Sequence, residues 1–281
     1  MKTFQEELDS FKKEIKEHTK GLDKSNLDLV DMQIKAYNER KLDSKVGNCK
    51  YCNNSGMIAY KNEYGVFALK TCVCYETRKC RERLKALGLL DFVYSLKGKF
   101  ENLPENEEWE REAKKKIKDF IENNEAKHWL CLCGSPGSGK TTKSVIVLSE
   151  LMKQYPNMTF DYFTWDTRYK ELVFGKDETK QALLEQLQEV DILFIDDFFR
   201  HQDGVLPQIE KEVAKAVIDY RYINKKITLI TSELYLTEIA HLDEAIGTRI
   251  YERCGYGKYL IQIKRDRSRN YRTKQNFGSI I

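Results

Sequence analysis

The sequence predicts an α/β protein in which a central parallel sheet follows a small, cysteine-rich N-terminal region. After Gly98, short apolar runs alternate with helical patterns, and such runs are typical of parallel strands that helices cover on both faces. Before Gly98, four cysteines fall in two close pairs around two short strand-like stretches. We therefore expect two domains, residues 1–98 and residues 99–281.

The N-terminal region is expected to contain two helices and a small β-hairpin. Apolar residues recur at helical spacing from Phe4 to Leu22 and again from Leu27 to Tyr37, which is the pattern of an amphipathic helix. Between about residues 46 and 80, the stretches "MIAY" and "VFALK" have the short apolar pattern of hairpin strands.

The C-terminal region is expected to alternate helices and strands. It begins with a charged helix from Glu105 to Asn124. Four strand-like runs follow, "HWLCLCG", "MTFDYFTW", "VDILFIDD" and "KITLITS". The helical patterns between them include Lys140–Leu151, Gln181–Gln188 and Glu210–Tyr222.

Composition indicates a globular chain without a membrane segment. Hydrophobic residues make up 41% of the sequence and charged residues 33%, and no apolar run approaches the roughly 18 residues that span a bilayer. The first residues, "MKTFQEELDSFKKEIKEHTKG", lack the apolar core of a secretory signal. We therefore expect a cytoplasmic protein whose eight cysteines are thiols rather than disulfides.

The net charge of +4 does not by itself imply a nucleic-acid partner, but basic residues cluster near the C-terminus. The stretch "KRDRSRNYRTK", from Lys264 to Lys274, carries most of the excess. Basic residues with a tyrosine among them suit a phosphate backbone. A solvated tail is the alternative.

A phosphate-binding motif lies between the first strand of this region and the next helix. Residues 134–141, "GSPGSGKT", match the pattern G-x-x-x-x-G-K-[ST] in the strand-to-helix context that the pattern requires. Its glycines let backbone N–H groups face a phosphate chain at the positive end of the helix dipole. We expect Lys140 to neutralise the β- and γ-phosphates and Thr141 to ligate Mg²⁺. The expected nucleotide-binding residues are Gly134, Ser135, Pro136, Gly137, Ser138, Gly139, Lys140, Thr141 and Thr142.

Polar residues end two later strands. Asp196 follows a buried apolar run, at the carboxyl edge where open α/β sheets bind ligands, and is expected to hold the magnesium. Asp197 is the candidate for orienting the attacking water, although it could instead cap the next helix. Thr231 and Ser232 end the strand "KITLITS" and could reach a γ-phosphate or its water, whereas capping a helix is the alternative for Ser232.

The cysteine spacing predicts a structural zinc site. Cys49, Cys52, Cys72 and Cys74 form C-x₂-C followed by C-x-C, and four thiolates in two close pairs can surround Zn²⁺ tetrahedrally. A module of this size needs such a cross-link to fold. Because C-x-C is less usual than a second C-x₂-C, Cys80 is a competing ligand.

The order of motifs resembles the AAA+ ATPases that load bacterial and phage replicative helicases, the DnaC and DnaI type. The matching pieces are the phosphate-binding motif, "DILFIDDFF", "DYRYINKKITLITSEL", "EAIGTRIYERC" and "SRNYR", which together extend over about residues 100–272. The Asp196-Asp197 pair looks like the loader form, where many other AAA+ proteins have Asp-Glu. Loaders of the DnaI type carry a comparable zinc module.

The resemblance implies further catalytic residues. Arg249, in "GTRI", matches an arginine finger that enters a neighbouring subunit's nucleotide site, and Arg272, in "NYR", matches a sensor arginine that contacts the γ-phosphate in its own subunit. Ser232 falls in the region of the first sensor, but Glu233 stands where loaders commonly carry Asn. A finger supplied by a neighbour implies self-association into a ring or an open spiral.

The resemblance also implies a function: a Mg²⁺-dependent ATPase of the primosome, which binds a hexameric replicative helicase through its N-terminal region and delivers it onto single-stranded DNA. An ATPase helper of a transposase shares the same core and is the nearest alternative. A P-loop kinase would need a lid rich in arginine and an acceptor pocket. A nucleotide-gated switch with vestigial hydrolysis is a further alternative.

Overall fold

The computed structural model describes residues 29–40, 49, 51–53, 55–91, 100–200 and 206–274, which divide into two compact units between Tyr75 and Glu76. The predicted boundary near Gly98 and the first predicted helix, Phe4–Leu22, lie outside the described residues. The division at residue 75 falls earlier than the predicted boundary because Leu84 and Leu89 are buried in the hydrophobic core of the second unit.

The first unit contains helix α2 (Leu29–Glu39) and an antiparallel hairpin of strands β1 (Met57–Lys61) and β2 (Phe67–Thr71). The side-chain amide of Asn38 donates to the carbonyl oxygen of Ala59 at 2.9 Å and its Oδ1 accepts from the Ala59 N–H at 2.9 Å. These two bonds join the helix to the hairpin. Both the second predicted helix and the predicted hairpin are confirmed, with helix α3 (Val73–Ala86) following them across the division between the units.

The second unit is built on a five-stranded sheet in the order β4-β5-β6-β3-β7, with every neighbouring pair parallel. Its strands are β3 (Leu130–Gly134), β4 (Phe160–Thr164), β5 (Ile192–Asp196), β6 (Ile227–Ser232) and β7 (Leu260–Ile263). Every residue of β3, β5 and β6 is buried, as expected for central parallel strands. The four predicted strands are confirmed, and β7 is an additional edge strand.

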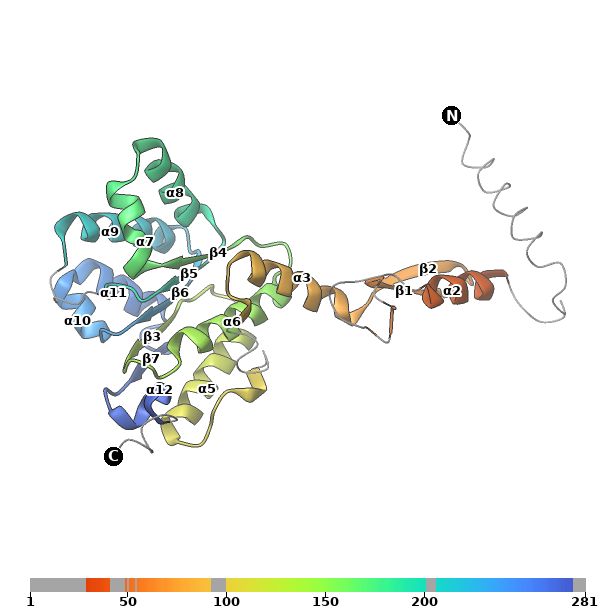
Figure 1. Ribbon diagram of the computed structural model, residues 1–281, viewed down its shortest axis with the longest axis horizontal. Helices are drawn as coiled ribbons and strands as arrows, with labels where there is room; N and C mark the ends of the chain where they lie inside the picture. The colour runs from red at the N-terminus through yellow and green to blue at the C-terminus, as the bar shows by residue number, and fades with distance from the viewer. Residues whose placement is uncertain are drawn as a thin grey trace. The chain divides into compact units, whose positions relative to one another are not determined.

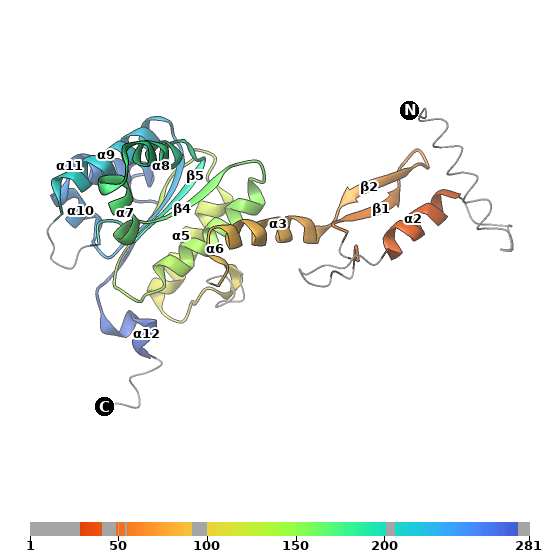
Figure 2. The ribbon, with the colours of Figure 1, turned by 45° about the horizontal axis from the view of Figure 1, so that its top comes forward.

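Helices cover both faces of this sheet, with α5 and α6 on one face and α7, α8, α9 and α11 on the other (Figures 1 and 2). Their bounds are α5 (Glu108–Glu122), α6 (Lys140–Gln154), α7 (Trp165–Phe174), α8 (Asp177–Glu189), α9 (Gln208–Ile223), α10 (Leu236–Leu242), α11 (Glu244–Arg253) and α12 (Tyr271–Lys274). The alternating pattern therefore predicted the layers correctly. One detail differs: Trp165, expected in a strand, is the first residue of α7 and is fully buried.

Among the described residues, no helix combines the length and the apolar composition needed to cross a membrane.

Candidate nucleotide site and metal centre

The turn between β3 and α6 needs glycine because other segments lie directly against it. Gly134 has φ +102°, and a Cβ there would lie 2.1 Å from the carbonyl oxygen of Ile263. Gly137 has φ +68°, and a Cβ there would lie 2.0 Å from Oδ1 of Asn270. Any side chain at either position would therefore displace the strand or the segment that packs on the turn.

Backbone N–H groups of the first turn of α6 face the glycine turn between β3 and α6. The residue before the helix, Gly139 (φ +75°), has no side chain that could accept their hydrogen bonds. Such groups carry the positive end of the helix dipole and are suited to an anion.

Lys140 lies inside the turn and is only 6% exposed. Its Nζ donates to the backbone carbonyl oxygens of Gly134 and Ser135, both at 2.9 Å. Burial lowers the pKa of Lys140, and neighbouring carboxylates, Glu233 first among them, oppose that shift. Because these hydrogen-bond partners are neutral, they do not balance the charge of the buried ammonium, and an anionic ligand would do so.

A cavity of about 540 Å³ opens beside the turn. It is lined by Pro104, Gly137, Gly139, Lys140, Thr141, Thr142, Lys143, Asp196, Asp197, Arg200, Glu233, Tyr271 and Arg272. Most of the predicted catalytic residues are thus brought together, although their positions are as many as 132 residues apart in the sequence, from Lys140 to Arg272.

Asp196 lies at the end of β5 and is 4% exposed. Its Oδ1 accepts hydrogen bonds from Thr141 at 2.9 Å and from Thr231, and its Oδ2 accepts one from Tyr162 at 3.1 Å. Burial raises the pKa of the carboxyl group, while the hydroxyl donors oppose that shift. A buried carboxylate beside a hydroxyl has the ligand chemistry that Mg²⁺ prefers.

The chemistry of the lining fits a magnesium-bound triphosphate. Four cationic residues line the cavity, Lys140, Lys143, Arg200 and Arg272, and their charges suit a polyanion of three phosphates. Thr141 and Asp196 are the residues that would hold the metal.

The two polar residues that end β6, Thr231 and Ser232, have different hydrogen-bond partners. Ser232 is fully buried, and its hydroxyl donates to the carbonyl oxygen of Phe198 at 2.7 Å rather than lining the cavity. Thr231, one residue earlier, bonds to the Asp196 carboxylate and accepts from the Asp197 N–H at 3.0 Å. Of these two hydroxyls, it is therefore that of Thr231 that contacts the acidic pair.

Of the two predicted catalytic arginines, one lines the cavity and the other does not. Arg272 lines the cavity. Arg249 does not; it lies on α11, where its Nε forms an ion pair of 3.2 Å with Asp219 on α9 and its guanidinium lies 5.7 Å from the ring of Tyr222.

Sequence reasoning missed a cluster beside the turn that joins α5, α6 and α12. Lys143 is 3% exposed, and its Nζ donates to the Ser138 carbonyl oxygen at 2.7 Å between the rings of Trp109 and Tyr271. The Tyr271 hydroxyl donates to Glu110. Burial lowers the pKa of Lys143 to about 8, against the opposing effect of Glu110. The sequence feature that could have identified Lys143 is its position one helical turn after Lys140.

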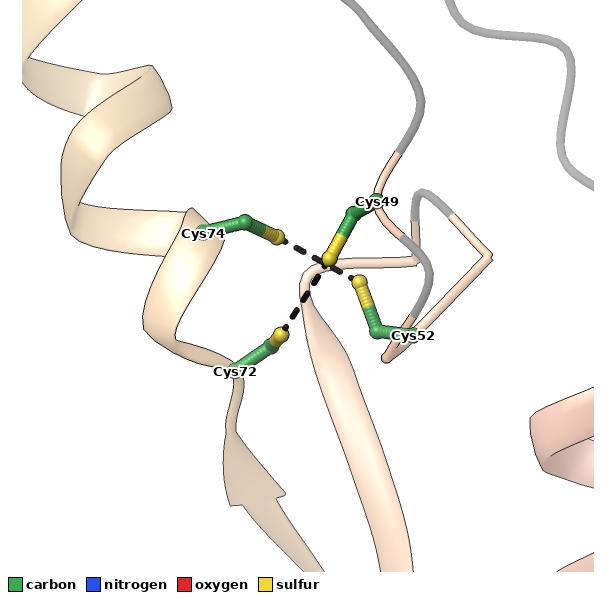
Figure 3. A group of neighbouring side chains, drawn as sticks. All are labelled: Cys49, Cys52, Cys72 and Cys74. Atoms are coloured by element: carbon green, nitrogen blue, oxygen red, sulfur yellow. Dashed lines mark hydrogen bonds between the residues drawn. The ribbon is translucent and has the colours of Figure 1, made fainter.

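The four predicted zinc ligands converge in the first unit. Their sulfur atoms lie within 4.8 Å of one another and point toward a common centre (Figure 3). The Sγ atoms of Cys49 and Cys72 are 3.7 Å apart, and those of Cys52 and Cys74 are 3.3 Å apart. Tetrahedral zinc with Zn–S bonds of about 2.3 Å would separate its ligands by about 3.8 Å, so the cluster fits zinc.

The loop before β1 supplies Cys49 and Cys52, while Cys72 lies between β2 and α3 and Cys74 is in the first turn of α3. Burial raises the pKa of Cys72 to about 12. In Cys52 burial acts in the same direction, but hydrogen bonds from Cys74 and the Gly56 N–H outweigh it and lower the pKa to about 6. The remaining cysteines are not part of the cluster: Cys80 contacts the Ser149 carbonyl oxygen at 3.5 Å in the second unit, and Cys131, Cys133 and Cys254 are fully buried in its core.

Comparison with known proteins finds one matching family model and two similar curated proteins. Residues 130–244 match a family described as RNA helicase. Two proteins of Bacillus subtilis (strain 168) are similar over most of their length: the uncharacterized protein YqaM, 31% identical over 225 residues (78% of this chain and 69% of YqaM), and the phage-like element PBSX protein XkdC, 29% identical over 226 residues (77% and 82%).

Among solved structures, a DnaC helicase loader matches with a TM-score of 0.50 and 23% identity, covering 60% of this chain and 97% of that one. This likeness shows the AAA+ fold. The relationship to YqaM, at 31% identity over more than two thirds of that protein, shows that the chain belongs to the same family as YqaM.

Proposed function

We propose that this protein is a Mg²⁺-dependent ATPase that associates with copies of itself and delivers a hexameric replicative helicase onto single-stranded DNA. The observation that carries the proposal is the cavity in which Lys140, Thr141, Asp196 and Arg272 converge on one side of the glycine turn.

Within one subunit, the residues around the cavity have separable roles. Lys140 and the N–H groups of the turn would bind the β- and γ-phosphates. Thr141 and Asp196 would hold Mg²⁺, which supplies Lewis-acid stabilisation of the phosphoryl charge. Asp197, one residue beyond, would orient the attacking water, and Arg272 would contact the γ-phosphate.

The position of Arg249 supports the proposed self-association. Because this side chain lies outside the cavity of its own subunit, we propose that it completes the site of a neighbour, where a positive charge offsets the charge of the transition state. Contacts of this head-to-tail kind generate rings or open spirals.

The loading role has support from the fold of the second unit and from the four-cysteine cluster in the first. The matched DnaC structure is that of a helicase loader. We propose that the zinc-bearing N-terminal region binds the helicase, that the ATPase region contacts single-stranded DNA, and that the protein acts in the cytoplasm during replication.

The test is co-elution of the purified protein with candidate hexameric helicases, with and without ATP, followed by helicase delivery onto single-stranded circles. We expect ATP-dependent delivery that the Lys140→Ala variant loses. Phosphate transfer from ATP to a small acceptor would instead indicate a kinase, and ATP-dependent binding of duplex DNA with a transposase would indicate a transposase helper. Delivery that survives Asp197→Asn while turnover is lost would indicate a nucleotide-gated switch.

A further inference from the structure

The turn after β5 has a backbone conformation that non-glycine residues rarely adopt. Asp197 has φ +53° and Phe199 has φ +56°, and both residues carry side chains. Such conformations persist only where the surrounding structure enforces them, and they concentrate at functional sites.

The end of β6 enforces this conformation from one side. The Asp197 N–H donates to the Thr231 hydroxyl at 3.0 Å, and the Phe198 N–H donates to the Thr231 carbonyl oxygen at 2.8 Å. The Ser232 hydroxyl donates to the Phe198 carbonyl oxygen at 2.7 Å. Thr231 and Ser232 thus position the turn.

Aromatic packing holds the turn from the other side. The rings of Phe198 and Phe199 are stacked with their centroids 3.9 Å apart, and Trp165 packs edge-on against Phe198 at 4.9 Å. All three side chains are buried. These contacts hold the backbone of Asp197, Phe198 and Phe199, so any rearrangement on ligand binding falls to the side chain of Arg200.

Arg200 lies between two carboxylates in the nucleotide cavity. Its guanidinium is 2.9 Å from Asp197 and 3.6 Å from Glu233, and all three residues line the cavity. The arginine side chain is 43% exposed. Ion pairs this open to solvent contribute little to stability. The free energy needed to exchange these two carboxylates for another anion is therefore small.

We infer that Arg200 senses the γ-phosphate within its own subunit, leaving Asp197 and Glu233 when a triphosphate binds. The inference rests on the proposed ATPase function and adds a sensor to it. A terminal phosphate offers a guanidinium more charge and a bidentate geometry. The exchange also frees the Asp197 carboxylate to orient water. Glu233 then has a defined purpose as the resting partner of Arg200, in the position where loaders commonly carry Asn.

Equilibrium binding of ATP and ADP tests the inference without reference to turnover. We expect Arg200→Ala to weaken binding of a non-hydrolysable ATP analogue about tenfold, the value of one charged hydrogen-bonded contact, and to leave ADP affinity within about twofold. Glu233→Gln should have the opposite sign and increase the preference for the ATP analogue over ADP, because the arginine loses one resting partner. Arg200→Lys should recover part of the affinity.

The matched control is Arg168→Ala. Arg168 also forms an i,i+3 ion pair, at 3.0 Å to Glu171, and does not line the cavity, so this variant should bind both nucleotides as the wild type does. Thermal unfolding of each variant without nucleotide checks that the turn is intact.

The inference is overturned if Arg200→Ala weakens ATP and ADP binding equally, strengthens ATP binding, or matches Arg168→Ala. In those cases the ATPase proposal would still stand if the wild-type protein binds ATP and the Lys140→Ala variant does not. A wild-type protein that binds neither nucleotide would overturn both.

Discussion

The Thr141 hydroxyl donates a hydrogen bond of 2.9 Å to Oδ1 of Asp196, joining the start of α6 to the end of β5. Two adjacent oxygens of an octahedral Mg²⁺ site, each at about 2.1 Å from the metal, lie about 3.0 Å apart. The hydroxyl and the carboxylate are therefore already spaced as neighbouring ligands of one metal ion, although 55 residues separate them in the sequence.

Removing the hydroxyl should disable the metal site without unfolding the turn. We expect Thr141→Ala to lower Mg²⁺-dependent ATP turnover by on the order of 10- to 100-fold and to raise the Mg²⁺ concentration needed for half-maximal rate. Thr141→Ser, which keeps the oxygen, is the control and should remain close to wild type. Equal losses in the two variants would show that the methyl group, not the hydroxyl, matters there.

Lys143 predicts a pH dependence of nucleotide binding. Burial lowers its pKa to about 8, so its positive charge disappears as the pH rises through that value. We expect affinity for ATP to fall several-fold between pH 7.5 and about pH 9.5, measured by titration at fixed ionic strength. Lys143→Arg keeps its charge throughout this range and should flatten the dependence, leaving only the contribution of Lys140.

Unfolding does not explain such a fall. An unfolded chain retains the lysine proton up to its ordinary value of 10.5, so between about pH 8 and that value the unfolded state binds more protons. Folding stability due to Lys143 therefore rises with pH over this range. A parallel fall in affinity for wild type and Lys143→Arg would contradict the assignment.

Much of this site was predictable because its chemistry is local in sequence. The glycine turn, Lys140 and Thr141 are consecutive, Asp196 ends an apolar run, and the four zinc ligands form two close pairs. What the sequence did not reveal depends on tertiary contacts. Strand β7 has only four residues and becomes a strand by pairing with β3, and the partnership of Arg200 with Glu233 joins residues from two different strand ends.

The cysteine cluster predicts that zinc stabilises the first unit alone. We expect one zinc ion per chain by elemental analysis, lost on Cys52→Ser substitution, with unfolding of the hairpin but retention of ATP binding by the second unit. The control is Cys80→Ala, which removes a cysteine outside the cluster and should retain the full zinc content. Loss of zinc from the Cys80 variant would return that residue to the ligand set.

A buried arginine should dominate the stability of the second unit. Arg221 is fully buried, and its guanidinium donates to the carbonyl oxygens of Leu187 (2.9 Å), Val190 (2.7 Å) and Ile227 (2.6 Å). Arg221→Met leaves these acceptors unpaired and should lower the free energy of unfolding by about 3 kcal/mol, measured by urea denaturation. Arg168→Met removes an i,i+3 ion pair from a side chain that is 38% exposed and should change the free energy of unfolding by less than about 0.5 kcal/mol.

The position of Arg249 outside its own cavity makes the sharpest prediction about assembly. Arg249→Ala subunits keep an intact cavity but cannot complete a neighbour's, so we expect normal ATP binding and a loss of turnover of about 10³-fold. Lys140→Ala subunits have the converse defect. Mixing the two inactive variants should restore part of the turnover, because a Lys140→Ala subunit can insert its arginine into an intact Arg249→Ala site. Mixing Arg249→Ala with the Lys140→Ala/Arg249→Ala double variant should restore none, since neither subunit donates the arginine. Recovery in neither mixture would mean that Arg249 acts within its own subunit or only through its ion pair with Asp219. Recovery in both mixtures would mean that turnover is restored without any Arg249, so that this arginine is not the group that a neighbour contributes.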